Sequence, residues 1–128
     1  MDSTPHHMHR ICIIDDDAAV RDSMRVLLES YGYEVRTFDS AAAFLVVPNT
    51  YCCLIIDLRM PVTNGLELLE LLRMGGVATP AIMMTDKIEP TLAARMEAAG
   101  APARLLKPIA EIELIGAIAD ACGERCAA

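Results

Sequence analysis

The chain has 128 residues, the size of one ordinary domain with a single hydrophobic core. A hydrophobic share of 54% argues against disorder, and no apolar run approaches the roughly 20 residues that span a bilayer. Eleven Lys and Arg against 18 Asp and Glu give a net charge of −7, which opposes attraction to a nucleic acid backbone. We expect a soluble protein that contacts neither a membrane nor a nucleic acid directly.

The folded part is expected to span residues 10–122. Residues 1–9 are polar and lack the apolar segment of a signal peptide, so they are interpreted as a flexible leader. The histidines at positions 6, 7 and 9 could bind a transition metal, but a disordered leader or cloning remnant is the favoured interpretation. Residues 123–128 form a short C-terminal tail that is too small to be an output domain.

Five cysteines bear on the compartment, namely Cys12, Cys52, Cys53, Cys122 and Cys126. The first three lie in predicted strands, where cysteine behaves as a small apolar residue. The last two are four positions apart, but no second Cys or His pair completes a zinc site. We therefore expect buried, reduced thiols and a cytoplasmic location.

Apolar runs and amphipathic segments alternate along the chain. A strand over 11–14 is followed by a helix over 18–31, for which Asp17 is the expected N-cap and Gly32 the expected end. The alternation continues with strand 34–38, a helix from Ser40 to 47, strand 51–56, helix 66–74, strand 81–84, helix 90–99, strand 103–106 and helix 111–122.

This order predicts an α/β domain with one doubly wound parallel sheet and helices on both faces. The run 51–56 is apolar throughout rather than alternating, as expected for a strand buried on both sides. Right-handed crossovers place the first and third strands side by side at the centre of the sheet. Chain order reverses between these two strands, at the point where ligands bind in such sheets.

Polar residues that can carry chemistry stand at four strand ends. Asp15 and Asp16 follow the first strand, Asp57 the third, Thr85 the fourth and Lys107 the fifth. Because the carboxyl ends of parallel strands share one edge, we expect these side chains to converge. Asp57 is the most informative of them, since it follows the most apolar strand directly.

Carboxylates placed close together either raise a pKa or hold a hard cation. Mg²⁺ is the natural candidate for two or three of Asp15, Asp16 and Asp57, because it takes a few carboxylate oxygens and a backbone carbonyl, which Arg59 could supply. A carboxylate beside a metal and an ammonium can attack phosphorus to form an acyl phosphate. Asp57 is best placed for that attack.

The other two strand-end residues suit the same chemistry. Lys107 would neutralise charge on the transferring phosphoryl group, as the metal would. The Thr85 hydroxyl could hydrogen-bond to a phosphoryl oxygen and so report its presence.

Each residue alone also has a structural explanation. Residues 15–17 would favour a helix dipole, Asp57 could be a turn residue, Thr85 a satisfied hydroxyl and Lys107 a solvated charge. The functional interpretation is favoured because all of them stand at separate strand ends of one predicted sheet.

The ordered set of motifs resembles the receiver domains of two-component response regulators, over residues 10 to about 122. The acidic motif is Ile13-Ile14-Asp15-Asp16-Asp17, the phosphoacceptor loop Asp57-Leu58-Arg59-Met60-Pro61 with Gly65, the switch hydroxyl Met84-Thr85 and the lysine motif Leu106-Lys107-Pro108. The segments 31–45 and 57–69 look most like receivers of the nitrogen-fixation regulator type, which usually precede a helix-turn-helix output domain.

The resemblance implies a flavodoxin-like receiver fold with five helices, strand order 2-1-3-4-5 and a cis Lys107-Pro108 peptide. It implies a phosphorylation-controlled signalling switch that is not an enzyme. A sensor histidine kinase or phosphotransfer protein would phosphorylate Asp57, with Mg²⁺ held by Asp16, Asp57 and the Arg59 carbonyl, assisted by Asp15. The face made by the fourth helix, fifth strand and fifth helix would then change to control an unknown output domain or protein. Look-alikes also form homodimers on phosphorylation.

Two positions depart from the family pattern. Arg104 stands where the family commonly has Tyr or Phe, so it either swings between solvent and an acidic partner or is a solvated surface residue. Asp86 follows the hydroxyl where a small residue is usual, and its charge should disfavour phosphate entry unless Lys87 offsets it. We expect an altered lifetime of the acyl phosphate.

Two other functions compete with the signalling switch. A haloacid dehalogenase-like hydrolase or phosphomutase would need an acid two residues after Asp57, where Arg59 stands and cannot serve as an acid. A pseudo-receiver would keep the fold and act through a fixed interface. The intact acid, hydroxyl and lysine set argues against it, while Arg104 and Asp86 keep it open.

Overall fold

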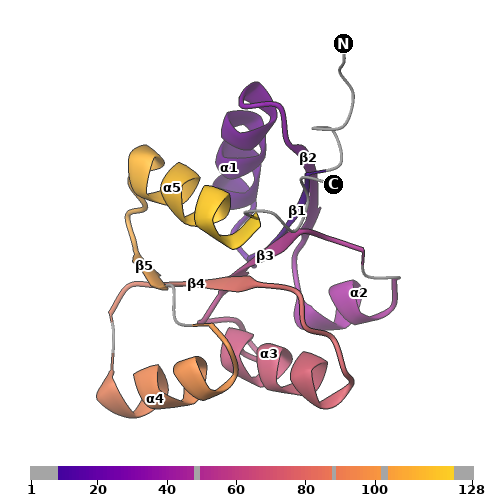
Figure 1. Cartoon of the computed structure of the whole chain (residues 1–128), viewed down its shortest axis with the longest axis vertical. Helices are drawn as coiled ribbons and strands as arrows, with labels where there is room; N and C mark the ends of the chain where they lie inside the picture. The colour runs from indigo at the N-terminus through magenta and orange to yellow at the C-terminus, as the bar shows by residue number, and fades with distance from the viewer. Residues whose placement is uncertain (1–8, 48–49, 88, 102–103, 123–128) are drawn as a thin grey trace.

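A computed structural model describes residues 9–47, 50–87, 89–101 and 104–122, with the side chain of Arg104 excepted. Its centre is one sheet of five parallel strands, with helices on both faces (Figure 1). Within this described part, no helix combines the length and the apolar character that crossing a bilayer requires.

The elements alternate strictly along the chain. They are β1 Arg10–Ile14, α1 Ala18–Ser30, β2 Glu34–Phe38, α2 Ala41–Leu45, β3 Cys53–Asp57, α3 Gly65–Met74, β4 Ala81–Thr85, α4 Pro90–Ala98, β5 Arg104–Leu106 and α5 Glu111–Cys122. The strand order is β2-β1-β3-β4-β5, and every neighbouring pair is parallel. The predicted fold class, strand order and central β1–β3 pair are therefore confirmed.

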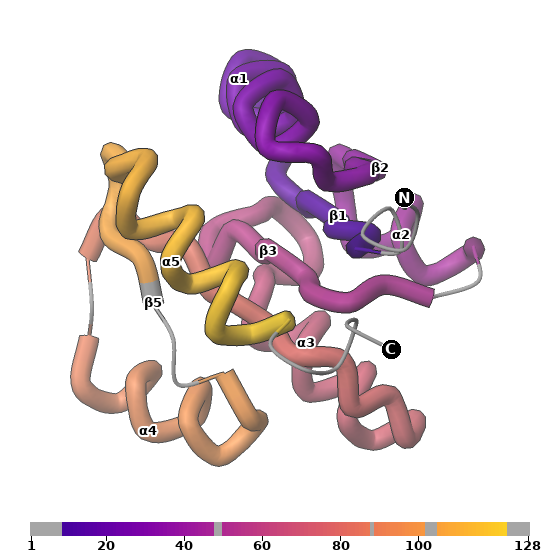
Figure 2. Tube along the Cα trace, turned by 45° about the horizontal axis from the view of Figure 1, so that its top comes forward, coloured from indigo at the N-terminus to yellow at the C-terminus, as the bar shows by residue number. Residues whose placement is uncertain are grey.

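The sheet separates two hydrophobic clusters because successive side chains on a strand point to opposite faces. Ile11 and Ile13 of β1 pack with residues of α1 and α5, whereas Cys12 and Ile14 pack with residues of α2, α3 and α4. Figure 2 shows the same division, with α1 and α5 on one side of the strands and α3 and α4 on the other. All five residues of β3 are buried, as its apolar sequence predicts.

Side-chain caps fix the helix starts that face the site. Asp17 accepts hydrogen bonds from the backbone N–H groups of Ala19 and Val20 at 2.9 and 3.3 Å, which confirms it as the N-cap of α1. Asn64 and Glu67 form a reciprocal capping box at the start of α3, at 2.8 and 2.9 Å. The loop that follows Asp57 is thereby tied to the beginning of α3.

Several predicted boundaries differ from the structure by one residue, and two differ by two residues. Helix α2 ends at Leu45 rather than at residue 47, because Val46 already leaves the helix as its C-cap. Strand β3 begins at Cys53 rather than at Tyr51 and includes Asp57. The apolar pattern marks burial, and both Tyr51 and Cys52 are buried without being strand residues. Residues 1–8 of the predicted leader, the predicted tail and residue 103 lie outside the described part of the chain, as does the predicted role of the Arg104 side chain.

The prediction of reduced cysteines is wrong for Cys52, which is disulfide-bonded. Thiol pairing depends on distant chain segments meeting, which spacing along the sequence does not reveal. Cys12 and Cys53 are free, and burial raises the pKa of both thiols, so they are unreactive apolar core residues. The cytoplasmic location loses Cys52 as support and stays a prediction.

Candidate functional site

The predicted site residues come together at the carboxyl edge of the sheet. Asp57 and Thr85 are the last residues of β3 and β4, and Asp15 and Lys107 directly follow β1 and β5. Backbone hydrogen bonds extend the sheet past the strand ends, from Leu58 N–H to the Met84 carbonyl and from Lys107 N–H to the Thr85 carbonyl, both at 2.8 Å. The side chains therefore project from a rigid frame rather than from free loops.

Three carboxylates form the acidic part of the site. Asp15, Asp16 and Asp57 each offer an oxygen, and these oxygens lie within 4.8 Å of one another. Asp15 is fully buried and Asp57 is 4% exposed, while Asp16 is open to solvent. Clustered hard oxygen donors with one solvent-facing member suit a small divalent cation such as Mg²⁺, which keeps part of its water shell. The donor set thus fits the predicted ion.

A single ammonium balances the two buried acids. Lys107 Nζ lies 3.4 Å from Asp15 Oδ2 and 3.4 Å from Asp57 Oδ1. Burial disfavours the charged amine, but the carboxylates of Asp57 and Asp15 outweigh that effect and hold the pKa of Lys107 above its ordinary value. One positive charge against three carboxylates leaves the cluster negative, which again favours a divalent cation.

Asp57 is the acid with the perturbed protonation equilibrium. Burial, and secondly the charge of Asp15, raise its pKa from 3.8 to about 6. Lys107 and the Arg59 N–H, which donates to Asp57 Oδ1 at 3.2 Å, pull the pKa in the opposite direction and only partly offset the rise. A cation bound beside Asp57 would favour the ionised form of its carboxylate.

Thr85 is 1% exposed, and its hydroxyl is fully engaged within its own loop. Its Oγ1 donates a hydrogen bond to the Lys87 carbonyl at 2.7 Å and accepts one from the Lys87 N–H at 3.3 Å. The hydroxyl therefore pins the beginning of the β4–α4 loop. For it to bind another oxygen acceptor, the Lys87 carbonyl must be released.

Gly65 makes room for the Asp57 backbone. A Cβ atom at this position would collide with the Asp57 carbonyl oxygen and would lie 2.8 Å from Ile56 Cγ2. Its N–H donates to the Leu58 carbonyl at 3.0 Å. The sequence suggested a turn at Asn64-Gly65, and the structure adds that Gly65 is needed for the close approach of α3 to the end of β3.

Two contacts at the site were not foreseen. Arg21 Nη1 donates to the Asp15 carbonyl at 2.7 Å and so ties α1 to the acidic loop. Arg59 Nε lies 3.1 Å from Asp86 Oδ1, whereas Lys87 pairs with Glu89 at 3.8 Å. Asp86 is thus offset by Arg59 and not by Lys87, its neighbour in the chain. The sequence does show opposite charges in these two loops, which indicates that an ion pair could form between them. It does not show which of the charged residues pair.

The implied cis peptide between Lys107 and Pro108 is present. It lies where the chain turns from β5 toward α5, directly after the ammonium-bearing residue.

Comparison with known proteins identifies the family of the chain. The response regulator receiver domain family matches residues 11–119. The chain is 42% identical over 113 residues to the transcriptional regulatory protein FixJ of Azorhizobium caulinodans, covering 87% of this chain and 54% of FixJ. It is 39% identical over 110 residues to the response regulator protein TodT of Pseudomonas putida, covering 84% of this chain and 48% of TodT. The chain thus spans about half the length of these curated relatives.

Solved structures agree as well. The response regulator StyR superposes with a TM-score of 0.85 at 36% identity, covering 92% of this chain and 60% of StyR. The chemotaxis protein CheY4 of Vibrio cholerae gives a TM-score of 0.81 at 27% identity, covering 89% of this chain and 98% of CheY4. The fold and these comparisons define a receiver domain of the kind found in two-component response regulators. The chain belongs to the response regulator receiver domain family.

Proposed function

We propose that this chain is switched by phosphorylation of Asp57, the acid at the centre of the site. The observation that carries the proposal is the placement of Asp57 Oδ1 3.4 Å from the Lys107 ammonium, in a cluster with Asp15 and Asp16. An oxygen of Asp57 attacks the phosphorus of a phosphohistidine on a sensor kinase or phosphotransfer protein. The new O–P bond forms as the P–N bond breaks, and the electron pair returns to the imidazole, which takes a proton from solvent.

The residues around Asp57 have distinct parts in this proposal. Asp15, Asp16, Asp57 and the Arg59 carbonyl would hold Mg²⁺, which when bound would neutralise charge on the phosphoryl oxygens. Lys107, whose Nζ lies 3.4 Å from Asp57 Oδ1, supplies a second positive charge beside Asp57. The Thr85 hydroxyl leaves the Lys87 carbonyl and donates to a phosphoryl oxygen, which frees the β4–α4 loop to move.

The expected output surface is the face made by α4, β5 and α5, which would contact an output domain or protein or a second copy of the chain. Leu106 on β5 and Ile112 on α5 are 48% and 82% exposed, so both offer apolar surface to a partner. FixJ is named a transcriptional regulatory protein and continues beyond the region matched here. An output domain that acts on transcription is therefore part of the proposal, while the acidic receiver itself makes no nucleic acid contact. We assign the switch to the cytoplasm.

Incubation with acetyl phosphate and Mg²⁺, followed by intact mass measurement, tests the proposal. We expect one added phosphoryl group that is removed by hydroxylamine, because acyl phosphates react with this nucleophile. Asp57→Asn should show no addition, and Asp120→Asn, which changes an exposed acid on α5, should label like the wild type. An unlabelled wild type under conditions that label a control receiver would contradict the proposal, as would labelling of Asp57→Asn.

A further inference from the structure

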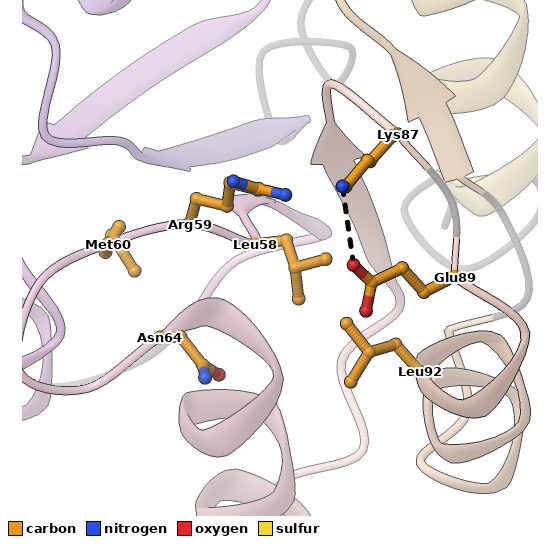
Figure 3. Close-up of a pocket in the computed structure, with 7 residues that line it drawn as sticks. All are labelled: Leu58, Arg59, Met60, Asn64, Lys87, Glu89 and Leu92. Carbon is orange, nitrogen blue, oxygen red and sulfur yellow. Dashed lines mark ion pairs between the residues drawn. The ribbon is translucent and has the colours of Figure 1, made fainter.

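A pocket of about 460 Å³ lies between the β3–α3 and β4–α4 loops, and its lining begins at Leu58, the residue that follows Asp57. It is lined by Leu58, Arg59, Met60, Asn64, Lys87, Glu89 and Leu92 (Figure 3). Arg59 and Lys87 are the cationic residues of this lining, and an anion that approaches Asp57 from the pocket meets them first. What these two cations are bound to therefore decides how the site receives an anion.

Both cations are already paired with acids. Lys87 Nζ lies 3.8 Å from Glu89 Oε2, both within the β4–α4 loop. Arg59 Nε lies 3.1 Å from Asp86 Oδ1, and this pair bridges the two loops. Lys107, the ammonium beside Asp57, is shared between Asp57 and Asp15. An incoming phosphoryl group thus finds each of these three cations already facing a carboxylate.

Asp86 can exchange its partner without a change in the core. The side chains of Arg59 and Asp86 are 55% and 58% exposed, so both can turn to solvent while the backbone stays in place. The backbone of Arg59 also lies next to Asp57, because its N–H donates a hydrogen bond to Asp57 Oδ1 at 3.2 Å. The guanidinium therefore extends from a residue that already contacts the proposed acceptor.

Asp86 is also the neighbour of the hydroxyl that we propose to bind the phosphoryl group. It directly follows Thr85, whose hydroxyl holds the Lys87 carbonyl at 2.7 Å. The Arg59–Asp86 pair and the Thr85–Lys87 hydrogen bond thus fasten consecutive residues of one loop. Release of either contact loosens the same segment.

We propose that Asp86 competes with the phosphoryl group for Arg59, and so lowers the affinity of the site for a phosphoryl group on Asp57. In the unphosphorylated chain Arg59 binds Asp86, and in the phosphorylated chain it turns to the phosphoryl oxygens and leaves Asp86 to solvent. Asp86 is a positioning residue that acts through Arg59. This inference rests on the proposed role of Asp57 and adds a chain-specific regulator to it.

Binding of beryllofluoride with Mg²⁺, followed by ¹⁹F NMR at low ionic strength, tests the competition. Beryllofluoride occupies the acceptor carboxylate as an uncleavable phosphoryl analogue. We expect Asp86→Asn to bind it about two- to fivefold more tightly than the wild type, as the loss of one exposed ion pair implies. Asp120→Asn removes the same charge from α5 and should match the wild type.

The dependence on Arg59 is tested by repeating the comparison in an Arg59→Met background. Competition through Arg59 predicts that Asp86→Asn then has no more effect than Asp120→Asn. An equal gain with and without Arg59 would show direct repulsion of the anion and would overturn the inference. The urea midpoints of Asp86→Asn and wild type should agree, because the pair is exposed.

The remaining outcomes separate the inference from the proposed function. If the wild type binds beryllofluoride, Asp57→Asn does not, and Asp86→Asn equals Asp120→Asn, then the competition is refuted and Asp57 remains the acceptor. If the wild type fails to bind, or Asp57→Asn binds equally well, both the proposed function and the inference are refuted.

Discussion

Lys107 Nζ lies 3.4 Å from Asp57 Oδ1, although β4 separates the strands from which the two residues project. The ammonium reaches across the sheet edge to the central strand, and it contacts Asp15 at the same distance. This geometry makes Lys107 the counter-ion of two buried acids at once. Its removal should therefore affect both the chemistry and the protonation of the site.

Lys107→Met should slow labelling by acetyl phosphate at least about tenfold, because a positioned cation that stabilises transferring charge is lost. The rate is measured by intact mass over time, with Mg²⁺ present. Arg95→Met removes a surface cation that pairs with Glu70 on α3, and it should label at the wild-type rate. Equal rates for Lys107→Met and Arg95→Met would exclude a role for Lys107 in transfer.

The raised pKa of Asp57 predicts that the metal-free protein, kept so by EDTA, becomes less stable to unfolding as the pH rises. The folded chain holds the proton more tightly than the unfolded chain, with a pKa of about 6 against 3.8. Protonated Asp57 therefore stabilises the fold below pH 3.8, and this stabilisation is lost as the pH rises through 6. The free energy of unfolding of Asp57→Asn, measured relative to the wild type, should therefore rise between pH 4 and pH 7.5. The expected rise is about 2 to 3 kcal/mol.

Urea unfolding of both proteins across this range in EDTA provides the measurement. A stability difference that does not change between pH 4 and 7.5 would show that Asp57 titrates normally. Mg²⁺ should reduce the difference at pH 7.5, because a bound cation favours the ionised carboxylate.

Gly65→Ala should destabilise the fold by about 1 to 3 kcal/mol, since its Cβ would press on the Asp57 carbonyl and on Ile56. Gly116 is the matched control, because it lies inside α5 and a Cβ there meets nothing within 4 Å. Gly116→Ala should stabilise by about 0.5 to 1 kcal/mol, as expected for alanine in a helix. Opposite signs in thermal or urea unfolding are expected, and a shared sign would contradict the packing argument.

Asp86→Ala should lengthen the lifetime of the phosphorylated state about two- to fivefold. The change removes a negative charge beside the proposed acyl phosphate and frees Arg59 to contact it. The measurement follows loss of the phosphoryl group by intact mass after the donor is removed. Rates that match those of Asp120→Asn would reject an effect of Asp86 on lifetime.

Much of the fold was predictable because its signals are local. The apolar runs, the helix caps at Asp17 and Ser40 and the turn glycine Gly32 each act within a few residues, and the structure contains all of them. The convergence of Asp15, Asp57, Thr85 and Lys107 then followed from parallel topology alone. Boundaries were less certain where burial extends past a strand, as at Tyr51 and Cys52.

The contacts that could not be predicted from the sequence depend on the backbone paths of the loops and on side-chain rotamers. Nothing in the spacing of Asp86 and Lys87 shows that Asp86 turns to Arg59 while Lys87 turns to Glu89. The hydrogen bond from Thr85 to the Lys87 carbonyl depends likewise on how the β4–α4 loop folds back. The disulfide at Cys52 is a further bond that the cysteine spacing did not indicate.

Among the described residues, the strand that precedes Lys107 is the shortest of the sheet, and it lies at the sheet edge beside β4. Until β5 has joined that edge, Asp15 and Asp57 face each other without an ammonium between them. The cluster of Asp15, Asp57 and Lys107 is therefore complete only when β5 has joined the sheet. A truncated chain that ends before β5 would keep both acids and the Thr85 hydroxyl, yet it would lack the balanced cluster. Phosphoryl labelling of Asp57 would accordingly serve as an assay for the intact sheet.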